Sequence, residues 1–160
     1  MRVYLAPSWR GGAETLRPWV DGLRRRGFEA EALPLPLGPA ARAVPRFLAV
    51  AGPDSVLGGT SFGGRVASLA AAQAAVAGLL CFAYPLGDDP EERTRHWPRV
   101  SCRTLVVNGE LDELSDPEEL RGRLPLLRGG RLELLPGAGH DLATHVDRVL
   151  DLAAGFLTTL

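Results

Sequence analysis

Residues 55–75 read SVLGGTSFGGRVASLAAAQAA, and this stretch decides the fold. The run Ser55–Gly58 is typical of a buried strand, and the Ala-rich run Gly64–Ala75 is typical of a helix. Between them, Gly59–Gly63 has the pattern G-x-S-x-G, which in a sharp strand-to-helix turn presents its central serine as a nucleophile. The stretch therefore predicts a strand, a tight turn and a helix, with Ser61 at the turn.

The two glycines of this pentapeptide have a mechanical reason to be there. In so sharp a turn, side chains two positions to either side of the central residue would collide, which favours Gly59 and Gly63. Ser61 would lie at the N-terminus of the helix, where free amides and the helix dipole favour developing negative charge. The pattern alone is weak evidence, because a Gly-rich turn without a reactive serine looks the same. A reactive Ser61 needs a base and an acid elsewhere in the chain.

Around this stretch, short apolar runs alternate with segments of helical periodicity, which is typical of an α/β fold with a parallel sheet covered on both faces. We expect a three-layer sandwich and a single domain over residues 1–160, because no repeat or linker divides the chain. The first helix carries apolar residues from Leu16 to Leu23, and the last from Leu142 to Phe156. The Pro-rich run Leu33–Pro39 is expected to be a loop. The six expected strands are Arg2–Ala6, Phe28–Leu33, Ser55–Gly58, Gly78–Ala83, Arg103–Asn108 and Arg131–Leu135.

A serine hydroxyl needs a neighbouring base at neutral pH, and His140 is the favoured candidate. It ends the Gly-rich loop Gly137–His140 after the sixth expected strand and directly precedes a helix. His145 looks like a helical residue, and His96 belongs to the loop before the fifth strand. Either of these two could be a structural or surface residue.

The base in turn needs a carboxylate that orients its ring, and Asp112 is the favoured candidate. It follows the fifth expected strand in the motif Gly109-Glu-Leu-Asp112, so it should project from the same sheet edge as Ser61. Glu110 is the nearest competitor. Asp116 is better explained as a helix N-cap, because Pro117 and two acidic residues follow it.

These motifs, in this order, resemble the α/β-hydrolase superfamily over nearly the whole chain, and within it the compact KANL/Tex-like and dienelactone-hydrolase-like branch. The resemblance implies a minimal α/β-hydrolase fold in which Ser61, Asp112 and His140 form a catalytic triad. It also implies that the first antiparallel strands and the cap domain of larger members are missing. The resemblance is carried by Gly58–Ser68, Tyr84–Leu86, Arg93–His96, Gly109–Asp112 and Pro136–Asp141.

The chain departs from this family in the loop after the first strand. Such hydrolases usually carry a His-Gly pair there, whereas this chain has Ala6-Pro7-Ser8-Trp9-Arg10-Gly11-Gly12. An oxyanion hole needs two backbone donors, and Pro7 has no N–H to give. We expect the amide of Phe62 to supply one donor and that of Ser8 or Trp9 the other.

The resemblance and the lack of a cap also predict a shallow substrate pocket. Trp9, Tyr84 and Trp97 are expected to wall it, together with the loop Pro34–Pro39. Arg10 or Arg65 could bind a substrate carboxylate, although an arginine on the helix after the turn more often makes a structural hydrogen bond.

Composition excludes several classes of protein. The 160 residues carry 18 basic groups, all Arg, against 19 acidic groups, so the sequence has no basic footprint for nucleic acid. The longest apolar stretch, Val66–Tyr84, reads as a helix followed by a strand rather than a membrane span. Cys81 and Cys102 fit reduced core thiols, and no metal or organic cofactor is expected. We expect a cytoplasmic monomer or homodimer that binds neither nucleic acid nor a membrane.

Together these features predict a serine hydrolase that cleaves a small carboxylic ester or thioester through an acyl-enzyme. The alternative is an interaction module that keeps the hydrolase fold but has a weak or inactive triad. A carboxylate nucleophile, as in dehalogenases and epoxide hydrolases, is disfavoured because Ser61 occupies the turn.

Overall fold

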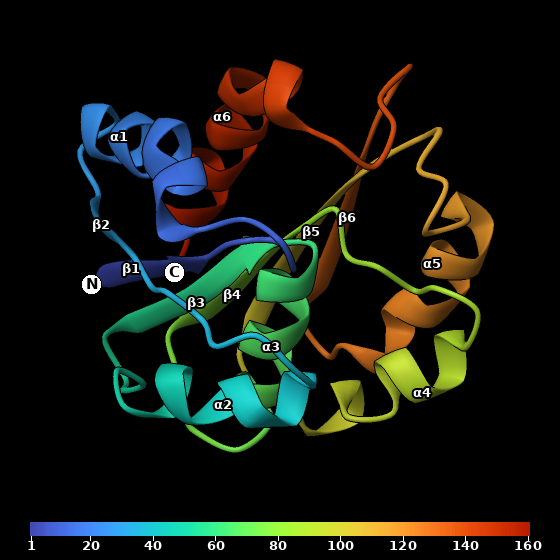
Figure 1. Cartoon of the computed structure of the whole chain (residues 1–160), viewed down its shortest axis with the longest axis horizontal. Helices are drawn as coiled ribbons and strands as arrows, with labels where there is room; N and C mark the ends of the chain where they lie inside the picture. Colours follow the sequence, from blue (N-terminus) through green and yellow to red (C-terminus); the bar gives the residue numbers. More distant parts are fainter.

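The computed structural model describes residues 1–160 and contains one sheet of six strands in the order β2-β1-β3-β4-β5-β6 (Figure 1). Every neighbouring pair is parallel. The predicted parallel sheet is therefore confirmed, and the predicted strands differ from the observed ones only at their ends. The strands are β1 Arg2–Ala6, β2 Glu29–Ala32, β3 Ser55–Thr60, β4 Gly78–Phe82, β5 Arg103–Gly109 and β6 Gly130–Leu135.

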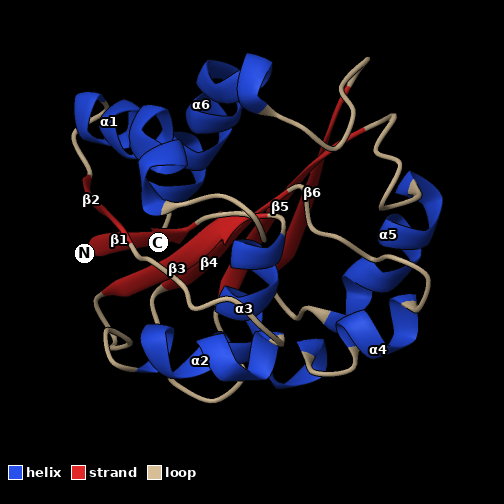
Figure 2. Cartoon of the chain, viewed as in Figure 1, coloured by secondary structure: helices blue, strands red, loops and turns tan.

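Helices cover both faces of the sheet and complete the expected three layers. Figure 2 shows α1 and α6 on one face and α2, α3, α4 and α5 on the other. The α-helices are α1 Arg17–Arg25, α2 Ala40–Leu48, α3 Phe62–Ala71, α4 Pro90–Thr94, α5 Pro117–Arg123 and α6 Val146–Leu157. Short 3-10 turns are η1 Ala13–Leu16, η2 Trp97–Arg99, η3 Leu124–Leu126 and η4 Ala143–His145.

The strands divide their side chains between two cores, because successive residues of a strand point to opposite faces. On β4, Leu80 and Phe82 join the core under α1 and α6, whereas Leu79 and Cys81 join the core under α2 and α3. All five residues of β4 are buried. This double coverage explains why β4 reads as a continuous apolar run rather than an alternating pattern.

Helix α2 was not predicted from the sequence. The run Leu33–Pro39 is a loop, as expected, but a helix begins directly after it at Ala40. Its buried residues Ala40, Ala43, Val44 and Phe47 have helical spacing. Pro45 inside the helix hides this pattern, since proline removes a backbone donor and normally breaks a helix.

The connection from β4 to β5 contains only α4 and η2, so no cap domain covers the sheet edge there. At α5, the carboxylate of Asp116 accepts a hydrogen bond from the Glu119 amide at 2.9 Å, which confirms the predicted N-cap. The apolar stretch Val66–Tyr84 is divided between α3 and β4, as expected. None of the helices has the length and apolar character that crossing a bilayer requires.

Candidate active site

Ser61 lies between the end of β3 and the start of α3 in a strained backbone conformation. Its φ is 48° and its ψ is −113°, a combination that residues other than glycine rarely adopt. The Ser61 amide donates a hydrogen bond to the carbonyl oxygen of Phe82, at the end of β4, over 2.7 Å. The neighbouring strand thus holds the turn in this geometry.

The two glycines beside Ser61 are required by close packing of backbone on backbone. A Cβ atom at Gly59 would lie 2.3 Å from the carbonyl oxygen of Ala6, and one at Gly63 would lie 2.1 Å from the same atom. Real Cβ atoms do not approach backbone this closely. The pentapeptide therefore packs α3 tightly against the end of β1, which supports the collision argument made from the sequence.

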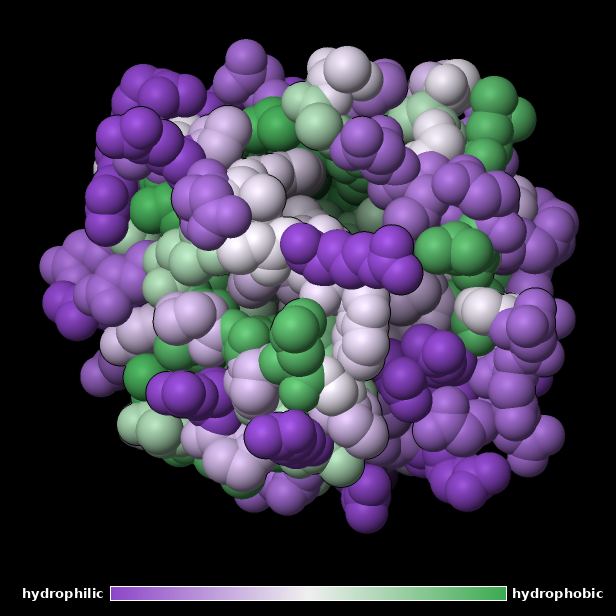
Figure 3. Space-filling view, in the orientation of Figure 1, coloured by the Kyte–Doolittle hydropathy of each residue, from purple (hydrophilic) through white to green (hydrophobic).

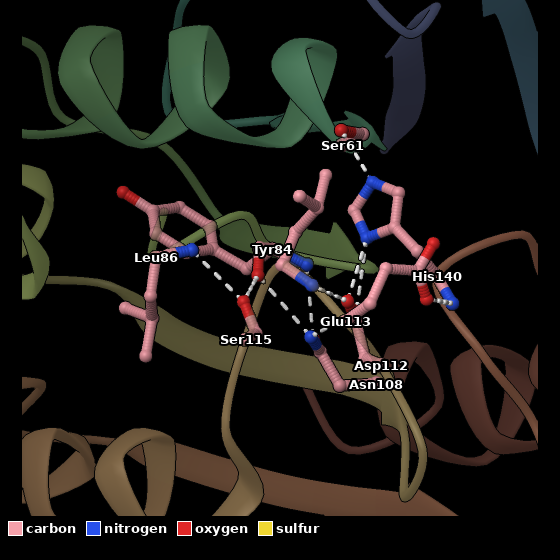
Figure 4. A network of polar contacts seen from close by, with 9 residues as sticks. Ser61, Tyr84, Leu86, Asn108, Asp112, Glu113, Ser115 and His140 are labelled. Carbon is pink, nitrogen blue, oxygen red and sulfur yellow. Dashed lines mark hydrogen bonds and ion pairs between the residues drawn. The ribbon is translucent and has the colours of Figure 1, made fainter. Parts of the chain in front are cut away.

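Three side chains from distant segments form one hydrogen-bonded series at the carboxyl edge of the sheet (Figure 4). Ser61 Oγ lies 2.8 Å from His140 Nε2. His140 Nδ1 lies 2.9 Å from each carboxylate oxygen of Asp112. Because Nδ1–H donates to the carboxylate, Nε2 is left to accept from the serine hydroxyl. The structure thus brings together the three residues that the sequence analysis singled out.

Asp112 is held from two further sides. Its side chain is fully buried, and Oδ1 accepts a hydrogen bond from the Leu114 amide at 2.8 Å. Its other oxygen, Oδ2, accepts one from Asn108 Nδ2 at 3.1 Å. A carboxylate with several donors keeps one orientation, so His140 meets a fixed acceptor.

Asn108 is a residue of this network that the sequence analysis did not identify. It is fully buried near the end of β5, and it ties Asp112 to the backbone of Tyr84 beyond β4. The Tyr84 amide donates to Asn108 Oδ1 at 2.9 Å, and Asn108 Nδ2 donates to the Tyr84 carbonyl at 3.2 Å. Ser115 also donates to that carbonyl and accepts from the Leu86 amide. The available signal was a polar residue directly after the apolar run Leu105–Val107 and still within β5.

The electrostatic surroundings of His140 favour its protonated form. The hydrogen bond with Asp112 raises the pKa of His140 against the opposing effect of burial, and the charges of Asp112, Glu113 and Asp141 add to the increase. Glu113 also accepts a hydrogen bond from the His140 amide at 3.2 Å. Bonds from its own amide and from that of His140 lower the pKa of Glu113. Glu113 therefore fixes the backbone of the loop that carries the imidazole.

The competing candidates lie outside the series. Glu110 is exposed, and His145 bonds only to its neighbour Thr144 among side chains. His96 is buried, with Nε2 at 2.7 Å from Ser68 Oγ, and burial lowers its pKa to about 4. This neutral, enclosed His96 has a structural role, which was one of the two roles left open for it.

Two cavities meet at Ser61. The first has a volume of about 280 Å³ and is lined by Ser8, Trp19, Phe82, His140 and Leu142, among others. The second has a volume of about 310 Å³ and is lined by Trp9, Phe62, Arg65, Arg93 and Leu114, among others. The face drawn in Figure 3 is hollowed, with apolar surface inside the hollow and both polar and apolar residues around it.

Two of the three residues expected to contact substrate do not reach either cavity. Tyr84 and Trp97 are both fully buried in the core under α2 and α3, with ring centroids 5.0 Å apart. Their expected role as pocket walls is therefore wrong, because both rings pack into this core instead of facing a cavity. Trp9 does line the second cavity and packs edge-on against Phe62 at 4.9 Å. Of the loop Pro34–Pro39, Pro39 lines it as well.

The three candidate oxyanion-hole residues lie around Ser61. Phe62 is the first residue of α3, where amides have no partner within the helix. The amides of Ser8 and Trp9 donate to no other backbone group. Ser8 lines the first cavity together with Ser61 and His140, whereas Trp9 lines the second. The structure contains no group of three or more His, Cys, Asp or Glu side chains that could hold a metal ion.

Comparison with known proteins shows which family this chain resembles. A family model described as an alpha/beta hydrolase domain matches residues 24–153. A dienelactone hydrolase from Anabaena variabilis superposes with a TM-score of 0.82 at 18% identity, over 99% of this chain and 85% of that one. A "putative hydrolase of the alpha/beta superfamily" from Xanthomonas campestris pv. campestris superposes with a TM-score of 0.80 at 22% identity, over 99% of both chains. At such identities the likeness shows the fold alone.

A curated relative from Synechocystis sp., named "Putative non-heme chloroperoxidase", is 36% identical over 62 residues. That match covers 38% of this chain and only 22% of the relative.

Proposed function

The chain belongs to the α/β-hydrolase superfamily, and from this premise we propose that it is a serine hydrolase that cleaves a small carboxylic ester or thioester. The observation that carries the proposal is the hydrogen-bonded series from Ser61 through His140 to Asp112. Such a series activates a hydroxyl that is otherwise a poor nucleophile at neutral pH. The small cavities beside Ser61 suit a short substrate rather than an enclosed lipid chain.

In the proposed mechanism, His140 Nε2 takes the proton of Ser61 as Oγ forms a bond to the substrate carbonyl carbon. The tetrahedral intermediate then breaks its bond to the leaving oxygen or sulfur, which receives the proton from His140. Water repeats the sequence on the acyl-enzyme and releases the acid and free Ser61. Asp112 keeps the imidazole in the required tautomer and stabilises its protonated form.

The oxyanion of that intermediate would be stabilised by the amides of Phe62 and Ser8. Ser8 is preferred to Trp9 because Ser8 lines the cavity that also contains His140. Gly11 and Gly12 follow in the same loop, and the Gly11 amide donates to the Ser8 carbonyl at 3.0 Å. This turn supports Ser8 beside the nucleophile without the His-Gly pair that is usual in the family.

Two substitutions at position 8 distinguish the role of the Ser8 backbone amide from that of its side chain. Ser8→Pro removes the backbone donor and is expected to lower kcat for p-nitrophenyl butyrate by about 100- to 1000-fold. Ser8→Ala keeps the donor and should retain activity within about threefold, because only the hydroxyl is lost. Melting temperatures of both variants provide the control for folding. Equal losses in the two variants would contradict the role of the amide.

A fluorophosphonate probe tests the proposed function directly, because it reacts only with an activated serine. We expect labelling of the parent protein, no labelling of Ser61→Ala and sharply reduced labelling of His140→Ala. The alternative, an interaction module on the hydrolase fold, predicts a folded protein that the probe does not label. A panel of short p-nitrophenyl esters and thioesters then ranks the acyl groups. The proposed reaction requires no metal or organic cofactor, and a cytoplasmic location stays a prediction.

A further inference from the structure

The second cavity beside Ser61 has a chemical character different from that of the first. Its charged lining residues are Arg65 and Arg93, and neither Asp nor Glu lines it. Trp9, Phe62 and Leu114 add apolar surface. Guanidinium groups with their planar sets of N–H donors bind carboxylates through paired hydrogen bonds. The cavity therefore combines a cationic part with an apolar wall, next to the nucleophile.

The protein itself leaves much of this donor capacity unused. Arg65 Nη2 lies 3.1 Å from both carboxylate oxygens of Glu92, and Arg93 Nε lies 3.7 Å from one of them. Two guanidinium groups thus share one carboxylate, which leaves one positive charge unbalanced. The Nε atom of Arg65 is buried without a hydrogen-bond partner. The Arg65 side chain is only 17% exposed and that of Arg93 31%, so water screens their charges less than on an open surface.

The position of His140 indicates which half of an ester would occupy this cavity. His140 must give its proton to the leaving group, and it lines the first cavity but not the second. The leaving group therefore belongs in the first cavity. An acyl chain attached to Ser61 then extends into the second cavity, toward the two arginines.

We propose that Arg65 and Arg93 form an anion subsite for the far end of the acyl group, so that the preferred substrates are monoesters of short dicarboxylic acids. The methylene groups of such an acid would pack on Trp9 and Leu114, and its free carboxylate would bind the guanidinium groups. This inference rests on the proposed serine hydrolase function, whose reaction it leaves unchanged. It assigns Arg65 a role in substrate binding, whereas the sequence favoured a structural hydrogen bond for this residue.

The test compares two esters of equal chain length, p-nitrophenyl hemiglutarate and p-nitrophenyl valerate. The hemiglutarate has a carboxylate where the valerate has its terminal methyl group. Rates without enzyme are subtracted. The ratio of their kcat/KM values is expected to favour the hemiglutarate by about tenfold, as charge-assisted hydrogen bonds would give. Arg93→Gln and Arg65→Gln are each expected to reduce this ratio about tenfold. Added salt should also reduce this ratio, because salt screens the attraction between the carboxylate and the guanidinium groups.

Two further variants separate the subsite from a purely structural ion pair. Glu92→Gln removes the carboxylate that competes for the guanidinium groups, so the ratio should rise, opposite to the change in the arginine variants. If Glu92 and Arg65 served only to hold α3 and α4 together, all these variants would change the ratio alike or leave it unchanged. Arg95→Gln removes a charge from an exposed residue outside the cavity and is the matched control, with an expected ratio within about twofold of the parent.

A parent ratio near one, or a ratio that Glu92→Gln lowers, would overturn the subsite while leaving the serine hydrolase proposal intact. If neither ester is hydrolysed, the proposed function fails, and calorimetric binding of glutarate to the parent protein still decides the subsite. Binding that Arg93→Gln weakens and Arg95→Gln does not would support the subsite. Absence of binding would overturn it.

Discussion

Replacing Ser61 by Ala or by Gly is expected to lower kcat for p-nitrophenyl butyrate by about a million-fold in either case, yet the Gly variant should be the more stable protein. Both substitutions remove the proposed nucleophile and its hydrogen bond to His140. They differ in how they fit the backbone. At a φ of 48° and a ψ of −113°, a Cβ atom is strained and glycine is not.

The magnitudes decide the expected order of stability. Strain at such a position costs about 1–3 kcal/mol, whereas the extra freedom of glycine in the unfolded chain costs about 0.5–1 kcal/mol. Ser61→Gly should therefore exceed Ser61→Ala in free energy of unfolding by about 1 kcal/mol, or about 2–4 °C in melting temperature. Urea and thermal unfolding of the two inactive variants measure this difference. An Ala variant more stable than the Gly variant by about 0.5–1 kcal/mol would show that the turn stores no strain.

Asp112→Asn is expected to lower kcat by about 10,000-fold while the fold persists, because an amide no longer fixes the tautomer of His140 or stabilises its charged form. Glu110→Gln is the matched control. Glu110 belongs to the same loop but is exposed, so we expect kcat within about twofold of the parent. A large loss in Glu110→Gln with a small loss in Asp112→Asn would reverse the assignment of the acid.

The residual activity of Asp112→Asn should also have a different pH dependence. In the proposed mechanism neutral His140 is the base, so kcat/KM falls as the pH drops through the pKa of its imidazole. In the parent protein Asp112 raises this pKa above its ordinary value. Without the carboxylate the pKa decreases, and the acid limb of the kcat/KM profile should move to lower pH. An unchanged acid limb would show that another group controls it.

Much of the candidate site followed from local sequence because Ser61, Asp112 and His140 each follow the end of a strand within a few residues. Parallel strands place their carboxyl ends at one edge of a sheet, so side chains that follow β3, β5 and β6 converge there. Gly59 and Gly63 also indicated the sharp turn from local sequence, because only glycine permits the backbone at these positions to approach Ala6 so closely. The choice of Asp112 over Glu110 could not be decided locally, because both lie in the same four-residue motif and their directions depend on the loop.

Local sequence alone determined the alternation of strands and helices, the tight turn and the candidate reactive groups apart from the choice between Asp112 and Glu110. Periodicity and backbone geometry act over a few residues, which is why local sequence was enough for these features. Tertiary structure alone decided what each polar or aromatic side chain faces. It buried Tyr84 and Trp97, placed Asn108 behind Asp112, and brought Arg65 and Arg93 to one cavity beside Ser61. These outcomes depend on how separate elements pack against one another, and no pattern within a single element encodes that packing.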